Sequence, residues 1–285
     1  MSGHMENSIA WNLAALLRSP LIAPLHPLLE QLAGEHFPAL ADCNVLLAQW
    51  PVMTQSGQPL RFVPQEYGKL AFERQYEPRC YLSGEVMTRE HNWHDLFNAL
   101  VWLTFPKAKA EINARHYAAL TGEQEKDSQR GAVRDMNTLL DESGVIVACA
   151  EADLAELLRG FRWKELFWQK RERVKAGMGV FLFGHGLYEK AMQPYVGLTG
   201  QGLVLPVVQE FFAWPQARQL SHLDDVLSAY LHDQRHCRDT RELTPLPLLG
   251  MPGWTTDNEC EAYYDNERYF RPGRRANSHR HGKMA

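Results

Sequence analysis

Residues 88–116 constrain the fold most, because they encode two consecutive helices with a fixed break between them. Apolar side chains recur at helical spacing over 93–103, and Asn92 in front of them is a favourable N-cap. Phe105-Pro106 then ends one helix and begins the next, since proline is tolerated in the first turn of a helix but not in its interior. The same stretch is dense in His, Asp, Asn, Lys and Arg, which indicates a site rather than an ordinary surface.

The remaining sequence predicts more helices than strands. Helical spacing of apolar residues extends over 6–50, 132–142 and 152–176. Short apolar or β-branched runs predict extended segments at 59–65, 145–150, 179–183 and 202–208. The proline- and glycine-rich segment TPLPLLGMPGW predicts irregular structure from about residue 243. We therefore expect an α+β fold: a mainly α-helical single domain with a few short strands and an irregular C-terminal segment.

Composition is that of an ordinary globular protein. Of the 285 residues, 45% are hydrophobic and 22% are charged. The net charge of −4 argues against general binding to nucleic acids or acidic membranes, and no run of about 18 apolar residues predicts a membrane span. The five cysteines are widely separated and form no CxxC pair, which argues against a zinc ribbon and indicates reduced thiols in a cytoplasmic protein.

The expected globular domain covers residues 5–272. Residues 1–4, MSGH, precede a second methionine and are interpreted as a remnant of the expression vector. From Arg271 onward there are five Lys or Arg residues and no acid, so 273–285 is expected to be a basic, disordered tail.

The first candidate constellation lies on the helix after Asn92. His91, Asp95, Asn98 and Trp102 have the spacing of one helical face, and His94 lies beside it. An imidazole with a carboxylate is the minimum for a general base with an orienting partner, or for part of a metal site. The alternative is structural: Asn92 and Asp95 resemble a capping box.

The next helix carries a second stripe, formed by Lys109, Asn113 and His116. With Lys107, these side chains suit an anion near the start of that helix. The alternative, which the pattern favours, is a solvated face on which Glu111 and Arg115 form an ordinary pair four residues apart.

The segment RGAVRDMNTLLDESG holds a third group. Arg134, Thr138 and Asp141 align on one face, with Asp135 on the flank. Carboxylates there can complete a hard-metal site with His94. The alternative is a helix whose polar side is wet and which ends in a turn at 141–144.

The fourth group is FGHGLYEK, which places His185 between two glycines directly after an apolar run. The glycines permit close approach of another chain segment or a ligand. His185 and Glu189 are four residues apart, a spacing usable for metal or acid–base chemistry, and Lys190 follows. The alternative is a structural histidine near the core.

Several words of the sequence resemble one family. They are NWHDLFNALVWLTFPKAKAEINARH, RDMNTLLDESGVIV, FGHGLYEK, PLPLLGMPGW and YYDNERYFRP. Together they resemble the bacterial family called domain of unknown function 3025, over about residues 60–272. The resemblance implies a soluble bacterial protein and brings no reaction, cofactor or residue role with it. Motifs for dinucleotide binding, the P-loop, the serine-hydrolase elbow and HExxH zinc proteases are absent.

The leading functional hypothesis is a hydrolase-like enzyme with a His/Asp pocket for a small polar or phosphorylated substrate. The predicted catalytic or metal-binding residues are His94, Asp95, Asp135 and His185. The predicted substrate-binding residues are Asn98, Lys109, Asn113, Arg134, Glu189 and Lys190. A divalent metal is the cofactor that this hypothesis allows.

Two alternatives remain open. One is a binding module without catalysis for a protein or RNA partner, supported by Tyr263, Tyr264, Tyr269 and Phe270 in front of the basic tail. No particular protein partner follows from the sequence. The other is that the polar residues form buried networks that fix helix packing.

Overall fold

The computed structural model describes residues 10–122 and 127–273 and confirms a mainly α-helical α+β fold. The expected remnant at 1–4 and all of the expected tail except Gly273 lie outside the described residues. The α-helices are α1 (Leu13–Arg18), α2 (His26–Leu29), α3 (Leu40–Gln49), α4 (Tyr76–Ser83), α5 (Trp93–Thr104), α6 (Pro106–Thr121), α7 (Asp127–Ser143), α8 (Ala152–Arg159), α9 (Arg171–Gly177), α10 (His185–Ala191) and α11 (Gln216–His232).

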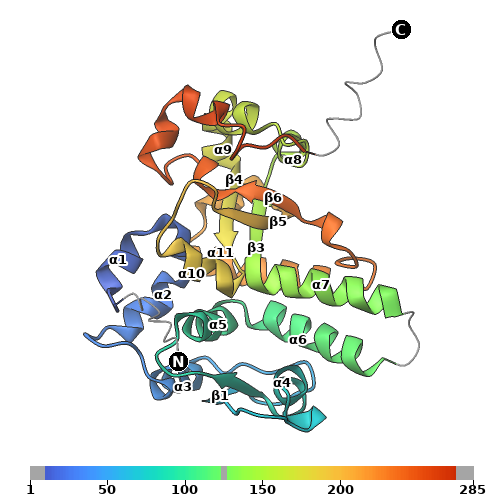
Figure 1. The fold of residues 1–285 in the computed structure, drawn as a ribbon. Helices are drawn as coiled ribbons and strands as arrows, with labels where there is room; N and C mark the ends of the chain where they lie inside the picture. The colour runs from blue at the N-terminus through green and yellow to red at the C-terminus, as the bar shows by residue number, and fades with distance from the viewer. Residues whose placement is uncertain (1–9, 123–126, 274–285) are drawn as a thin grey trace, which may run out of the picture.

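A four-stranded sheet lies in the upper half of the molecule in Figure 1, with α8 and α9 above it. Its strands, in the order β4-β3-β5-β6, are β4 (Met178–Leu182), β3 (Gly144–Cys149), β5 (Thr199–Pro206) and β6 (Thr244–Pro247). The central pair β3 and β5 is parallel, and both outer pairs are antiparallel. Every residue of β3 is buried, which explains why its sequence is a continuous apolar run rather than an alternating one.

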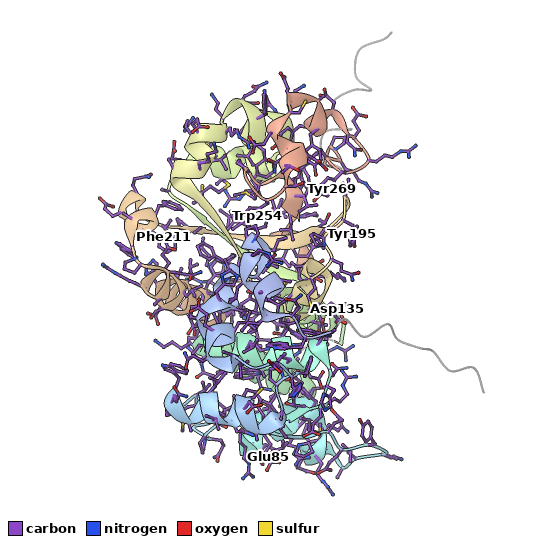
Figure 2. The ribbon with its side chains drawn as sticks, turned by 90° about the vertical axis from the view of Figure 1, so that its left-hand side faces the viewer. Glu85, Asp135, Tyr195, Phe211, Trp254 and Tyr269 are labelled. Atoms are coloured by element: carbon purple, nitrogen blue, oxygen red, sulfur yellow. The ribbon has the colours of Figure 1, made fainter. Side chains whose placement is uncertain are left out.

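A second, two-stranded sheet lies at the opposite end of the molecule. It pairs β1 (Arg61–Pro64) with β2 (Glu85–Thr88) in parallel, and α4 connects the two strands. Helices α5, α6 and α7 lie between the two sheets in Figure 1, and Figure 2 shows Glu85 and Tyr269 near opposite ends of an elongated molecule. The sequence-predicted site therefore falls in the helical layer between the sheets.

The predicted start of α5 and its break before α6 are confirmed. Asn92 is the N-cap, and its side chain accepts the backbone N–H of Asp95 at 3.0 Å. The reciprocal half of the predicted capping box is wrong, because the Asp95 carboxylate binds Arg89 through both the backbone and the guanidinium. His91 precedes the helix with a φ of 54°, so it does not share the helical face that its spacing suggested.

Helix α6 has no N-cap side chain of its own, since its N-cap residue is Phe105. Asp224 of α11 supplies the cap from a distant part of the chain. Its two oxygens accept the backbone N–H groups of Lys107 at 3.1 Å and Ala108 at 2.8 Å. A helix N-terminus is left with unpaired N–H groups, and a carboxylate there also meets the favourable end of the helix dipole.

The aromatic residues of the C-terminal segment belong to the core. Tyr264, Tyr269 and Phe270 are at most 7% exposed. The Tyr264 hydroxyl donates to the backbone oxygen of Gly250, and that of Tyr269 donates to that of Leu198. They are therefore not the exposed platform that the binding-module hypothesis required. No helix in 10–122 or 127–273 is long and apolar enough to cross a membrane.

We expect Asp224→Ala to lower the free energy of unfolding by about 1–3 kcal/mol, because two N–H groups of the first turn of α6, one of them buried, lose their acceptor. Chemical denaturation followed by circular dichroism measures this. Asp225→Ala is the matched control: Asp225 is exposed and pairs with the exposed Lys107 ammonium, and its loss should cost less than about 0.5 kcal/mol. Equal effects of the two variants would contradict the capping role.

Candidate functional site

The candidate site forms where β3 begins and β4 ends. These ends are neighbours because the two strands are antiparallel, with Val145 opposite Leu182. The backbone N–H groups of Phe183 and Gly184 both donate to the Gly144 oxygen, at 3.0 and 2.9 Å. The pairing brings the C-terminal turn of α7, just before β3, against the N-terminus of α10, just after β4.

Glycines at 184 and 186 permit this approach. A Cβ atom on Gly184 would lie 2.5 Å from the Glu142 carbonyl carbon and from the Gly144 nitrogen. A Cβ atom on Gly186 would lie 2.5 Å from a Glu142 carboxylate oxygen and 3.6 Å from the His94 ring. The close approach expected from the sequence FGHG is thus an approach of α10 to α7.

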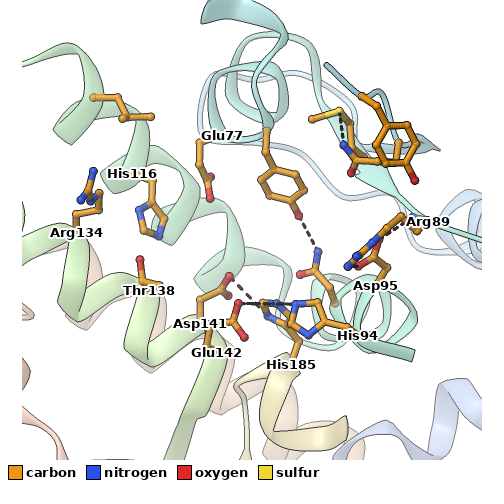
Figure 3. A pocket seen from close by; sticks show the side chains of 16 residues that line it. Glu77, Arg89, His94, Asp95, His116, Arg134, Thr138, Asp141, Glu142 and His185 are labelled. Carbon is orange, nitrogen blue, oxygen red and sulfur yellow. Dashed lines mark hydrogen bonds and ion pairs between the residues drawn. The ribbon is translucent and has the colours of Figure 1, made fainter. Parts of the chain in front are cut away.

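Three side chains from three helices converge at this junction: His94 of α5, Glu142 of α7 and His185 of α10 (Figure 3). The two Nε2 atoms are 3.1 Å apart. Glu142 Oε1 lies 3.5 Å from His185 Nε2 and 3.7 Å from His94 Nε2. His185 is only 6% exposed, whereas His94 and Glu142 are partly exposed toward the cavity. We call these three residues the histidine–glutamate cluster.

Each histidine of the cluster has a second carboxylate near its other nitrogen. Asp141 Oδ2 lies 3.7 Å from His185 Nδ1, and Glu189 Oε2 lies 3.4 Å from His94 Nδ1. Within the described part of the chain, the buried His185 Nδ1 has no hydrogen-bond partner. A carboxylate near this nitrogen favours the tautomer that carries the hydrogen there and leaves the other nitrogen to bind a ligand.

The carboxylates of the junction are held ionised. The hydrogen bond with His185 is the main cause that lowers the pKa of Glu142, against the opposing effect of burial. Burial would raise the pKa of Asp141, but the Lys109 ammonium and then His185 outweigh it, so that this pKa is also below its ordinary value. Both groups are therefore anionic near neutral pH.

Lys109 is the buried cation that balances Asp141. It is 3% exposed, and its Nζ donates to Asp141 Oδ1 at 2.5 Å and to Asn98 Oδ1 at 2.9 Å. The Asn98 amide in turn donates to the Tyr76 hydroxyl at 2.7 Å. This chain of bonds ties α4, α5, α6 and α7 together directly beneath the cluster.

A cavity of about 490 Å³ opens over the histidine–glutamate cluster. Its other polar lining residues are Gln65, Tyr67, Tyr76, Glu77, Arg89, Asp95, Asn98, His116, Arg134, Thr138 and Asp141. The carboxyl group of Glu77 is held by the Asn113 amide at 2.6 Å, and burial raises its pKa. On the side of the cavity away from Glu77, the Arg89 guanidinium donates two hydrogen bonds to the Asp95 carboxylate (Figure 3).

The structure places the sequence-predicted residues in three groups. His94 and His185 meet in the cluster, and Asp95, Asn98 and Arg134 line the cavity. Lys109 and Asn113 are buried behind the wall, so the solvated face favoured for their helix is wrong. Asp135 and Lys190 are exposed and do not line the cavity, while Glu189 lies beside His94 rather than pairing with His185.

The residues predicted from the sequence do not include Glu142 and Glu77. The sequence pattern places Glu142 in a turn, although its position between an amphipathic helix and a buried strand is a usable signal. His185 lies just after a strand, as Glu142 lies just before one. Polar residues that flank two apolar strands meet when the strands pair antiparallel, but the sequence alone does not show that pairing.

We expect Lys109→Met to cost about 3 kcal/mol or more of unfolding free energy, because Asp141 is left as an uncompensated buried charge. Adding Asp141→Asn should recover part of the loss. Lys107→Met, two residues away at an exposed pair, serves as the control and should change stability by less than about 1 kcal/mol. Thermal and urea unfolding measure all three. A Lys109→Met loss no larger than the control's would show that the buried pair is not stabilising.

Comparison with known proteins gives a family match. The family model described as "Protein of unknown function (DUF3025)" matches residues 60–274, which include the whole cluster and the cavity lining. No curated protein and no solved structure matches the chain. The matched range covers well over half of the sequence, and the chain belongs to the family described as protein of unknown function (DUF3025).

Proposed function

We propose that the protein is a divalent-metal-dependent hydrolase that acts on a small phosphorylated or similarly polar substrate in the cavity. The observation that carries this proposal is the convergence of His94, Glu142 and His185 at an open cavity. Two histidines and a glutamate are a donor set of catalytic zinc sites, which leave a further position for water or substrate.

The separations within the cluster support metal binding. Ligand atoms about 2.05 Å from a tetrahedral zinc ion lie about 3.3 Å from one another. The three separations in the cluster are 3.1, 3.5 and 3.7 Å. A cation can therefore contact all three donors with little movement of the side chains.

The surroundings of the two histidines also support metal binding. A carboxylate oxygen lies 3.4 Å from His94 Nδ1 and 3.7 Å from His185 Nδ1, so each Nδ1–H would face a negative charge when the Nε2 atom binds a metal. Without a metal, the two Nε2 atoms lie at hydrogen-bond distance, 3.1 Å, with a hydrogen on one of them. A divalent cation would replace that hydrogen, and the adjacent Glu142 carboxylate favours the higher positive charge.

His94, Glu142 and His185 would hold a divalent ion here, and the ion would supply water activated for attack at neutral pH. Hydrolysis would add the hydroxyl of water to the substrate phosphorus or carbonyl carbon, break the bond to the leaving oxygen and transfer a proton to that oxygen. Glu77 faces the cavity from the wall across from the cluster, and its raised pKa suits a group that delivers this proton (Figure 3).

The five cysteines are free thiols, which supports the cytoplasmic location expected from the sequence.

Metal binding is the first test. We expect the purified chain, dialysed against zinc and analysed for metal, to hold about one ion per chain and to melt at a higher temperature than the chelator-treated protein. Glu142→Gln and His185→Ala should lose the ion. His91→Asn is the matched control, since His91 lies three residues from His94, is exposed and has a positive φ that asparagine tolerates. Zinc bound equally by wild type and both cluster variants would reject this metal site.

Hydrolysis is the second test. The metal-loaded protein should release nitrophenol from para-nitrophenyl phosphate or its diester, and Glu142→Gln should reduce the rate by about 100-fold or more. Chelation should abolish turnover and metal should restore it. A protein that holds its metal but hydrolyses neither ester nor a panel of phosphorylated metabolites would contradict the hydrolase assignment. Native iron with oxygen-dependent turnover would instead assign the same donors to oxygenase chemistry.

A further inference from the structure

The part of the cavity wall farthest along α7 from the cluster carries a second set of polar groups. Arg134 and Thr138 lie one turn apart on α7 and are exposed into the cavity, and the buried His116 of α6 lies beside them in Figure 3. Thr138 is one turn before Glu142. Arg134 and Glu142 of the cluster thus lie on a single face of α7, two turns apart.

Arg134 differs from the other cations near the cavity in having no carboxylate partner. The Arg89 guanidinium is bound to Asp95 through two nitrogens, and Lys109 is bound to Asp141. Arg134 makes no ion pair with any side chain described in 10–122 or 131–273. An unpaired guanidinium at the wall of a cavity is free to bind an oxyanion through paired N–H donors.

The distance along the helix separates this guanidinium from the reacting centre. Arg134 and Glu142 are eight residues apart in the sequence, which corresponds to a rise of about 12 Å in an α-helix. Side chains on a helix lean toward its N-terminus, so the Arg134 guanidinium extends away from the cluster rather than toward it. One phosphate group cannot contact both Arg134 and the histidine–glutamate cluster, whereas an elongated molecule can.

We propose that the substrate is an elongated molecule with a terminal oxyanion, a carboxylate or phosphate, that binds Arg134 and Thr138 while the bond to be hydrolysed lies at the histidine–glutamate cluster. This inference rests on the proposed metal-dependent function. It adds a substrate class: a linear molecule with an anionic group at the end remote from the reacting bond. Arg134 then acts in binding and orientation and takes no part in the bond-breaking step.

Two metal-binding probes test the inference on the full, zinc-loaded chain. Suberic acid monohydroxamate carries a zinc-binding hydroxamate at one end and a carboxylate at the other, and its methyl ester lacks only the charge. Calorimetric titration should show that the acid binds wild type about tenfold or more tightly than the ester, because the ester cannot form the charge-assisted bonds to Arg134.

Variants of α7 locate the source of that preference. In Arg134→Ala the acid and the ester should bind with affinities within about twofold, while ester affinity and zinc content stay at wild-type values. Arg134→Lys should keep part of the preference, since lysine supplies charge without the paired donors. Asp135→Asn is the control on the adjacent exposed position outside the cavity and should keep the full preference.

The outcomes separate this inference from the proposed function. Zinc-loaded protein that shows no preference for the acid, or keeps the preference in Arg134→Ala, overturns the Arg134 subsite and leaves the metal site in place. Protein that binds no zinc overturns both.

Discussion

The candidate site depends on how closely α10 can approach the end of α7. Two backbone N–H groups of the segment after β4 share the carbonyl oxygen of Gly144, and no side chain at 184 or 186 keeps the helices apart. This contact is a continuation of the β3–β4 pairing, in which every residue of β3 is buried. The position of His185 relative to Glu142 is therefore set by the sheet rather than by a mobile loop, and such rigidity is what a metal or catalytic site requires.

The polar groups beneath the cluster connect two hypotheses drawn from the sequence: a buried network that fixes helix packing, and an enzyme with a His/Asp pocket. Lys109, Asn98 and Asp141 are buried and bonded to one another, as expected of residues that fix helix packing. Asp141 also faces His185 Nδ1. One carboxylate thus joins the network to the cluster, and packing and site are two functions of the same residues. A buried ion pair contributes little net stability compared with apolar residues, so its placement directly behind a candidate ligand favours a positioning role.

Local signals in the sequence were sufficient for much of the fold. The Asn92 cap, the break at Phe105-Pro106 and the buried strands at 145–150 and 202–208 all follow from capping, proline geometry and apolar runs, and the structure has them within a few residues. Non-local features were out of reach. Asp224 caps α6 from more than a hundred residues away, and no local pattern reveals it. His94 and His185 could be named from the sequence, but Glu142 could not be preferred to Asp135, because the choice depends on which face of α7 meets α10.

The charges of the cavity connect the cluster to the rest of its lining. Four carboxyl groups, those of Glu77, Asp95, Asp141 and Glu142, border it, and the Glu189 carboxylate lies beside His94. The cations are Arg89 and Arg134 in the lining and Lys109 directly behind it. With every group ionised, these five carboxylates and three cations carry two net negative charges, which oppose the binding of an anionic substrate. A divalent cation in the cluster would cancel them, and protonation of Glu77, whose pKa is raised, would leave one net positive charge. On the proposed function, the metal would therefore do more than supply a reactive centre: it would remove the repulsion that an incoming anion meets, and Arg134 would determine which end of that anion lies away from the metal.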